Sequence, residues 1–146
     1  MSVTAALARL VDVVKATQPT AAKGLGTKFV HDDRGDASVA RRFHFRVVEG
    51  FSDGAPALAV HRASVVVDLF MRYATAEKAG DLEAVIADDA LTLSKALADG
   101  TQWESADSGI IYVGAESGAK LFPFVVDDDG GARRLRVRFL LQVRVS

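Results

Sequence analysis

The chain has 146 residues with a formal net charge of −1, and 49% of its residues are hydrophobic and 25% charged. This is the composition of a folded globular domain rather than of a disordered chain, and it predicts a single domain over residues 1–146. The absence of cysteine excludes disulfide scaffolds, thiolate metal sites and cysteine nucleophiles. The nearly balanced charge argues against a protein that binds nucleic acid mainly through its overall field.

An amphipathic helix is the first predicted element. Its apolar stripe recurs at helical spacing and consists of Leu7, Leu10, Val11 and Val14. Thr4 is placed to cap this helix, and Pro19 lies where it should end. Charged residues interrupt the pattern, unlike in a signal peptide, and no apolar run approaches the about 20 residues of a membrane span. We therefore expect a soluble protein that is made in the cytoplasm.

The segment Thr20–Ser38 follows and is predicted to be a loop. It is long for a compact domain, contains Gly24, Gly26 and Gly35, and has few apolar residues that could anchor it. We expect this loop to be mobile in the isolated protein and to become ordered on assembly. Its role stays open.

Two strands are predicted next. Residues 39–48 are rich in aromatic and β-branched side chains, which favours a strand. Residues 49–56 have the composition of a turn, and residues 61–73 form a second strand with alternating apolar positions. Because one short turn separates the two strands, they are expected to pair as an antiparallel hairpin.

A second helix and two shorter strands are predicted after the hairpin. The helix begins at Thr75 or at Asp81, and its apolar stripe consists of Leu82, Val85, Ile86, Leu93 and Leu97. Residues 109–114 form a short strand, and the following extended segment carries Pro123, which belongs at a sheet edge. Residues 127–131, with the sequence DDDGG, are predicted to form a hairpin turn.

A long strand, residues 133–146, closes the chain. One set of alternate residues is apolar: Leu135, Val137, Phe139, Leu141, Val143 and Val145. The other set is mostly basic: Arg134, Arg136, Arg138, Leu140, Gln142 and Arg144. This alternation is typical of a strand with one face in the core. Together these elements predict an α+β fold, a two-layer domain with an antiparallel sheet of about four to five strands and two helices packed on one face.

The residues that could carry chemistry form no recognisable motif. His31, His44 and His61 have no metal-ligand spacing with one another or with carboxylates. Residues 127–129 lack the alternating acids and the distal glutamate of a calcium loop, and neither a GxSxG elbow nor a phosphate-binding loop occurs. We therefore predict no enzymatic activity, no cofactor and no metal site.

The sheet face away from the helices is the remaining candidate for function. It is expected to carry arginines from the closing strand and from the first strand of the hairpin, together with apolar residues such as Val66 and Phe70. A row of arginines can be a solvated face, but arginine is also enriched in interfaces. The candidate interface residues are Arg134, Arg136, Arg138, Arg144, Arg42 and Arg46.

The order and length of the elements also carry a family resemblance. In chain order they are the helix AALARLVDVV, the strands VARRFHFRVV and HRASVVVDLFMRY, the helix DLEAVIADDALTLSKALAD and the closing strand RRLRVRFLLQVRVS. In this order the chain resembles the tail terminator, or tail completion, proteins of long-tailed bacteriophages. The resemblance implies a structural virion protein that forms a homohexameric ring at the head-proximal end of the tail tube, where it stops tube polymerisation and joins the tail to the head or neck.

The same resemblance implies the partners of the chain. They are further copies of itself, the tail tube protein and a head–tail connector or neck protein, and no membrane is involved. DNA would pass through the bore of the ring without sequence-specific binding. The arginines of the closing strand would then face either the next subunit or the bore, and both alternatives stay open.

Two other functions are compatible with the sequence. A curved sheet with helices on one face can enclose a pocket for a small ligand, as in an enzyme or a carrier, and Trp103, Tyr73 and Phe70 would then line it. A nucleic-acid-binding module is the third hypothesis, and it predicts a steep dependence of binding on salt.

Overall fold

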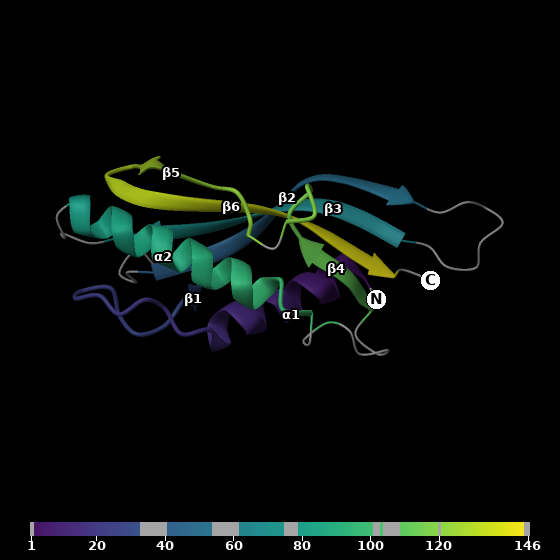
Figure 1. Cartoon of the computed structure of the whole chain (residues 1–146), viewed down its shortest axis with the longest axis horizontal. Helices are drawn as coiled ribbons and strands as arrows, with labels where there is room; N and C mark the ends of the chain where they lie inside the picture. The colour runs from purple at the N-terminus through teal and green to yellow at the C-terminus, as the bar shows by residue number, and fades with distance from the viewer. Residues whose placement is uncertain are drawn as a thin grey trace.

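The computed structural model describes residues 2–32, 41–53, 62–74, 79–100, 103, 109–119 and 121–144. Within them the order of elements is α1 (Val3–Ala16), β1 (Val30–His31), β2 (Arg41–Asp53), β3 (Arg62–Tyr73), α2 (Ala79–Leu97), β4 (Ile110–Gly114), β5 (Phe124–Asp129) and β6 (Ala132–Arg144). This order confirms the predicted α+β class (Figure 1).

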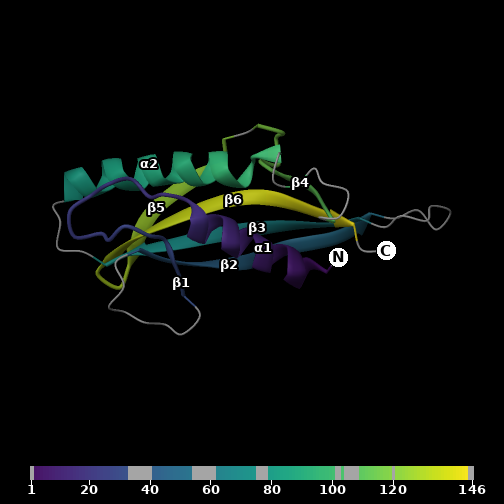
Figure 2. The same ribbon diagram turned by 90° about the horizontal axis from the view of Figure 1, so that it is seen from below.

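The strands form one curled sheet in which β2, β3 and β6 run side by side (Figures 1 and 2). Its order is β1-β2-β3-β6-β4, and β5 pairs with the part of β6 that β4 leaves free. The prediction of an antiparallel sheet of about four to five strands was wrong in two respects, because the described residues form a sheet of six strands and β1 pairs with β2 in parallel. The parallel pair covers two residues of each strand, too few to leave a periodic pattern in the sequence.

The core joins residues of both helices to one set of alternate strand residues. Leu10 of α1 and Ile86 of α2 belong to the same buried cluster as the odd-numbered residues of β3 and β6. The predicted apolar side of the closing strand is confirmed as far as β6 extends: Leu135, Val137, Phe139, Leu141 and Val143 are fully buried. Val145 lies outside the described residues.

Three predicted boundaries differ from the structure at the ends of α1, β2 and β5. Ser2, not Thr4, caps α1, because its hydroxyl oxygen accepts a hydrogen bond of 3.0 Å from the N–H of Ala5. β2 continues through Asp53 instead of turning at Glu49, since a bulge after Val47 absorbs one extra residue and lets the pairing with β3 resume.

The third correction concerns the DDDGG segment. Its three aspartates are the last residues of β5, and the turn consists of Gly130 and Gly131 alone. Both glycines have positive φ angles, 56° and 88°, as a two-residue hairpin turn requires. Asp127 and Asp128 consequently stand opposite Arg134 and Arg133 of β6 instead of in a solvated loop.

Residues 20–32 of the predicted mobile loop are anchored to the rest of the protein at a few positions, and their mobility stays a prediction. Leu25 and Phe29 are buried in the core. The N–H of Thr20 donates a 2.9 Å hydrogen bond to Asp89 Oδ1, and the Thr20 carbonyl accepts one of 2.6 Å from Arg41. Residues 33–38 lie outside the described part of the chain.

Asp89 is the centre of a buried polar network that the sequence analysis missed. It is fully buried on α2, accepts a 2.7 Å hydrogen bond from the Tyr73 hydroxyl, and lies 3.2 Å from Nε of the buried Arg41. Burial and the neighbouring Asp89 carboxylate raise the pKa of Tyr73 well above its usual value. The network joins α2, β2, β3 and the segment around Thr20, so its role is structural.

Candidate functional site

One face of the sheet lies opposite to the core, and we call it the outer face. It consists of the even-numbered residues of β3 and β6 and of the even-numbered residues of β2 up to Arg46. Strand pairing aligns them in rows that cross β2, β3 and β6. Neighbouring residues in a row are about 4.8 Å apart. The three rows that concern the site are Arg42–Arg72–Arg134, His44–Phe70–Arg136 and Arg46–Asp68–Arg138.

Two arginines of the outer face are held by carboxylates of the same chain. Arg138 donates from Nε and Nη2 to the two oxygens of Asp68, at 2.8 and 3.0 Å, and Asp68 is only 3% exposed. Arg134 donates in the same forked way to Asp127, at 3.0 and 2.8 Å. These paired hydrogen bonds lower the pKa of Asp127 and raise that of Arg138.

Arg46 and Arg136 differ from these two arginines. Neither makes a hydrogen bond or an ion pair with any residue that the structure describes. Both line an open depression of about 380 Å³, the remaining walls of which are Val47, Val48, Asp68, Phe70, Arg134 and Arg138. Among the described residues, Asp68 and Asp127 form ion pairs with two of its four guanidinium groups. The other two, Arg46 and Arg136, are left without an ion pair beside the exposed valines of the β2 bulge.

An aromatic contact forms one side of the same surface. The His44 ring stacks on Phe70 with centroids 5.2 Å apart, and the Arg134 guanidinium lies 5.0 Å from the centroid of Phe70. Burial lowers the pKa of His44, and the positive charges of Arg134 and Arg46 act in the same direction, whereas Asp32 opposes them. This direction favours the neutral form of His44 near neutral pH, so the ring adds little positive charge to the face.

The structure brings together four of the six arginines proposed from the sequence: Arg46, Arg134, Arg136 and Arg138. Arg42 lies at the edge next to β1, with its Nε 3.8 Å from Asp32. Arg144 lies at the far end of β6, six residues and so about 20 Å from Arg138. It does not belong to the depression.

Sequence reasoning missed the carboxylates that decide which arginines are free. Asp68 stands among apolar residues of β3 at a position that alternation assigns to the outer face, and this was the available signal. Its pairing with Arg138 joins residues 70 positions apart, so it depends on the register of β3 against β6. Asp127 was missed because DDDGG was taken entirely as a turn.

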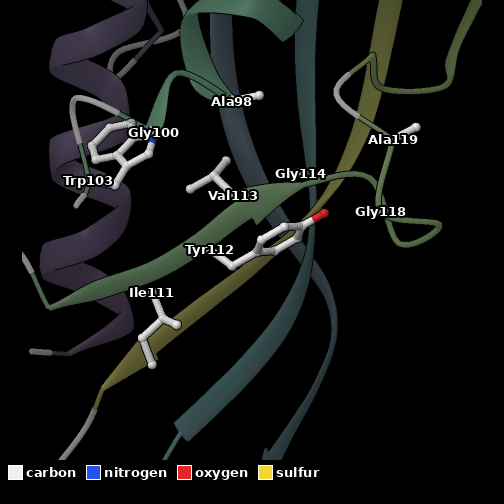
Figure 3. A pocket seen from close by; sticks show the side chains of 9 residues that line it. All are labelled: Ala98, Gly100, Trp103, Ile111, Tyr112, Val113, Gly114, Gly118 and Ala119. Carbon is white, nitrogen blue, oxygen red and sulfur yellow. The ribbon is translucent and has the colours of Figure 1, made fainter.

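A second cavity, of about 210 Å³, lies beside β4 and the end of α2 (Figure 3). Trp103 and Tyr112 line it, but Trp103 Nε1 donates to the Leu97 carbonyl at 2.7 Å and the Tyr112 hydroxyl to the Ala115 carbonyl at 3.0 Å. The pocket predicted from Trp103, Tyr73 and Phe70 is wrong, because Tyr73 is buried against Asp89 and Phe70 lies on the outer face.

Comparisons with known proteins give no assignment for this arrangement: no protein-family model matches the chain, and no curated protein matches it significantly. Among the residues that the structure describes, no helix is both long and apolar enough to cross a lipid bilayer.

Proposed function

We propose that the chain is a structural subunit of a homo-oligomeric ring that closes the head-proximal end of a bacteriophage tail tube. The observation that carries the proposal is the depression on the outer face. Its free guanidinium groups, Arg46 and Arg136, lie beside Val47 and Val48, which are 44% and 46% exposed. Arginine next to apolar side chains is the composition of an interface centre, where both groups lose water to a partner.

The arrangement of elements supports the same proposal. A first helix, a long hairpin, a second helix and a long closing strand occur in the order on which the resemblance to tail terminator proteins rests. In the proposed subunit α1 and α2 form one layer and the sheet the other, so that the outer face is left for contacts with neighbours. The protein then acts by shape and contact, and we assign it no catalytic role.

The proposal also names partners and a place. The ring would contain six copies, contact the tail tube protein on one side and a head–tail connector or neck protein on the other, and belong to the virion. DNA would pass through the bore without sequence-specific contacts.

Electron microscopy tests the proposal in two steps. The purified chain should form closed rings of one size with a central opening. Added to a phage tail tube protein during tube polymerisation, it should bind at one end and limit tube length. Tubes whose length and ends are unchanged at a molar excess of the chain would contradict the assignment as a tail terminator.

A further inference from the structure

Helix α2 carries an exposed stripe on the side away from its buried residues, with two acidic residues in its first part and a lysine, Lys95, in its last turn. Its members recur at helical spacing and are Asp81, Ala84, Asp88, Leu91 and Lys95. Asp81 and Asp88 make no hydrogen bond or ion pair within the described ranges of the chain. Leu91 is among the exposed large apolar residues, at 41%. One molecule therefore has two free carboxylates beside an exposed leucine on α2, and two free guanidinium groups beside exposed valines on the outer face.

The two sets are also similarly spaced. Asp81 and Asp88 are seven residues apart on a helix, which separates their Cα atoms by about 10.5 Å. Arg46 and Arg136 lie two strands and two residues apart, which gives a Cα separation of about 12 Å. The small difference between these two Cα separations is easily bridged by the long, flexible arginine side chains. Leu91, one turn beyond Asp88, would then lie over the apolar part of the depression.

We propose that α2 of one copy docks with this acidic stripe into the arginine depression of a second copy. Asp81 and Asp88 pair with Arg46 and Arg136, and Leu91 packs on Val47, Val48 or Phe70. The inference rests on the proposed ring, and it specifies the two surfaces that meet. Leu91 shields the paired charges partly from water, so the contact combines electrostatic complementarity with apolar burial.

The position of the two surfaces explains why the contact would build a ring. α2 contributes Ile86 and Leu93 to the core, whereas the outer face is the side of the sheet opposite to the core. A contact between different surfaces leaves one free stripe and one free depression on every pair, so copies add head to tail until the rotation between them closes the circle. A symmetric dimer, in which both copies use the same surface, would not do this.

Other described acids fit the depression less well. Glu83 of α2 already pairs with Arg133. Asp12 of α1 has Arg9 and Lys15 one turn away on either side, so its surroundings are basic. Glu116 lies close enough to Arg138 to raise the pKa of that arginine. Of the acidic groups compared, the stripe on α2 is the one that fits the arginine depression best.

Two neutral double variants test the contact by native mass spectrometry. The outer-face variant is Arg46→Gln with Arg136→Gln, and the helix variant is Asp81→Asn with Asp88→Asn. Each alone should assemble with a dissociation constant weakened about tenfold or more. Mixed in equal amounts they should form a heterodimer that does not grow, because the intact stripe of the first variant docks into the intact depression of the second.

Matched controls remove charges elsewhere on the surface: Asp12→Asn and Arg62→Gln should assemble like the unchanged chain, and all variants should keep its melting temperature. If the chain assembles and both double variants assemble equally well, the docking contact is wrong while the ring stands. If the mixture yields oligomers as large as those of the unchanged chain, the contact is wrong as well. A chain that stays monomeric at every concentration overturns both proposals.

Discussion

Arg136 and Arg138 are two residues apart on the same face of β6, yet their surroundings differ. Arg138 holds the buried carboxylate of Asp68 with two hydrogen bonds, whereas Arg136 makes no hydrogen bond or ion pair in the described part of the chain. A guanidinium that already satisfies a buried carboxylate contributes to the fold, and one that lies free in a depression is available to a partner. This difference separates stability from assembly at the level of single side chains.

The first prediction uses this pair. Arg138→Ala should lower the free energy of unfolding by about 1–3 kcal/mol, because Asp68 would stay buried without its partner while the exposure of Arg138 limits the loss. Arg136→Ala should change it by about 0.5 kcal/mol or less. Urea denaturation of the dilute, unassembled proteins measures both. Equal losses in the two variants would show that the assigned pairing is wrong.

His44 gives a prediction on pH. Because burial lowers its pKa below the usual 6.5 in the folded protein, the unfolded chain binds more protons at this site as the pH falls. The stability that this histidine contributes is complete above pH 6.5 and is lost as the pH falls through the lowered pKa of the folded state. His44→Gln should therefore lose less stability on acidification than the unchanged chain.

Melting temperatures of both proteins between about pH 7.5 and about pH 5 measure this effect, since both retain the other titrating groups. Parallel curves would mean that His44 titrates with an ordinary pKa and that its stacking on Phe70 leaves it fully solvated.

The closing strand shows at the scale of elements what the sequence could predict. Its alternation assigns Phe139 to the core and Arg136 to the other face, because strand side chains point to opposite sides with a period of two. The bulge after Val47 and the register of β3 against β6 have no such local signal, so the extent of β2 and the partner of Arg138 were not predictable. Asp89 had a signal that was overlooked, a carboxylate within the apolar stripe of α2.

Packing of β6 gives the third prediction. Phe139 is fully buried between Phe45, in edge-to-face contact at 6.0 Å, and Phe122, stacked at 5.4 Å. Phe139→Ala should cost about 3–5 kcal/mol of unfolding free energy through lost burial and a residual cavity. Leu140→Ala, on the half-exposed outer face of the same strand, should cost about 1 kcal/mol or less in the free subunit. Similar losses of unfolding free energy in the two variants would show that the core and outer faces of β6 are assigned wrongly.

The segment between α1 and β2 gives the fourth prediction. Amide hydrogens of Thr20 and Asp32 should exchange slowly in the free subunit, because they donate to Asp89 and to the Phe43 carbonyl. Asp89→Ala should increase exchange at Thr20 and cost about 3–5 kcal/mol, since Arg41 would stay buried without its carboxylate. If these amides exchange in the unchanged protein as fast as in an unstructured peptide, the hydrogen bonds of this segment do not hold it, and the mobile loop predicted from the sequence is correct.

At the scale of the whole molecule, two unsatisfied surfaces of opposite charge lie on opposite sides of one small subunit. The buried apolar residues of β3 and β6 explain why the chain folds. Arg46 and Arg136 on the outer face, and Asp81 and Asp88 on α2, form no hydrogen bond or ion pair with the described residues. A homo-oligomer that pairs these surfaces uses both, and a ring uses them in every copy.

The mass of the assembled chain, measured by native mass spectrometry over a series of concentrations at low and high salt, tests this account most directly. The account predicts one discrete species of six times the 15.5 kDa subunit at low salt. This species should dissociate as salt is raised, because the proposed contacts are ionic and only partly shielded from water. A mass of 15.5 kDa at the highest concentration and the lowest salt would contradict the account.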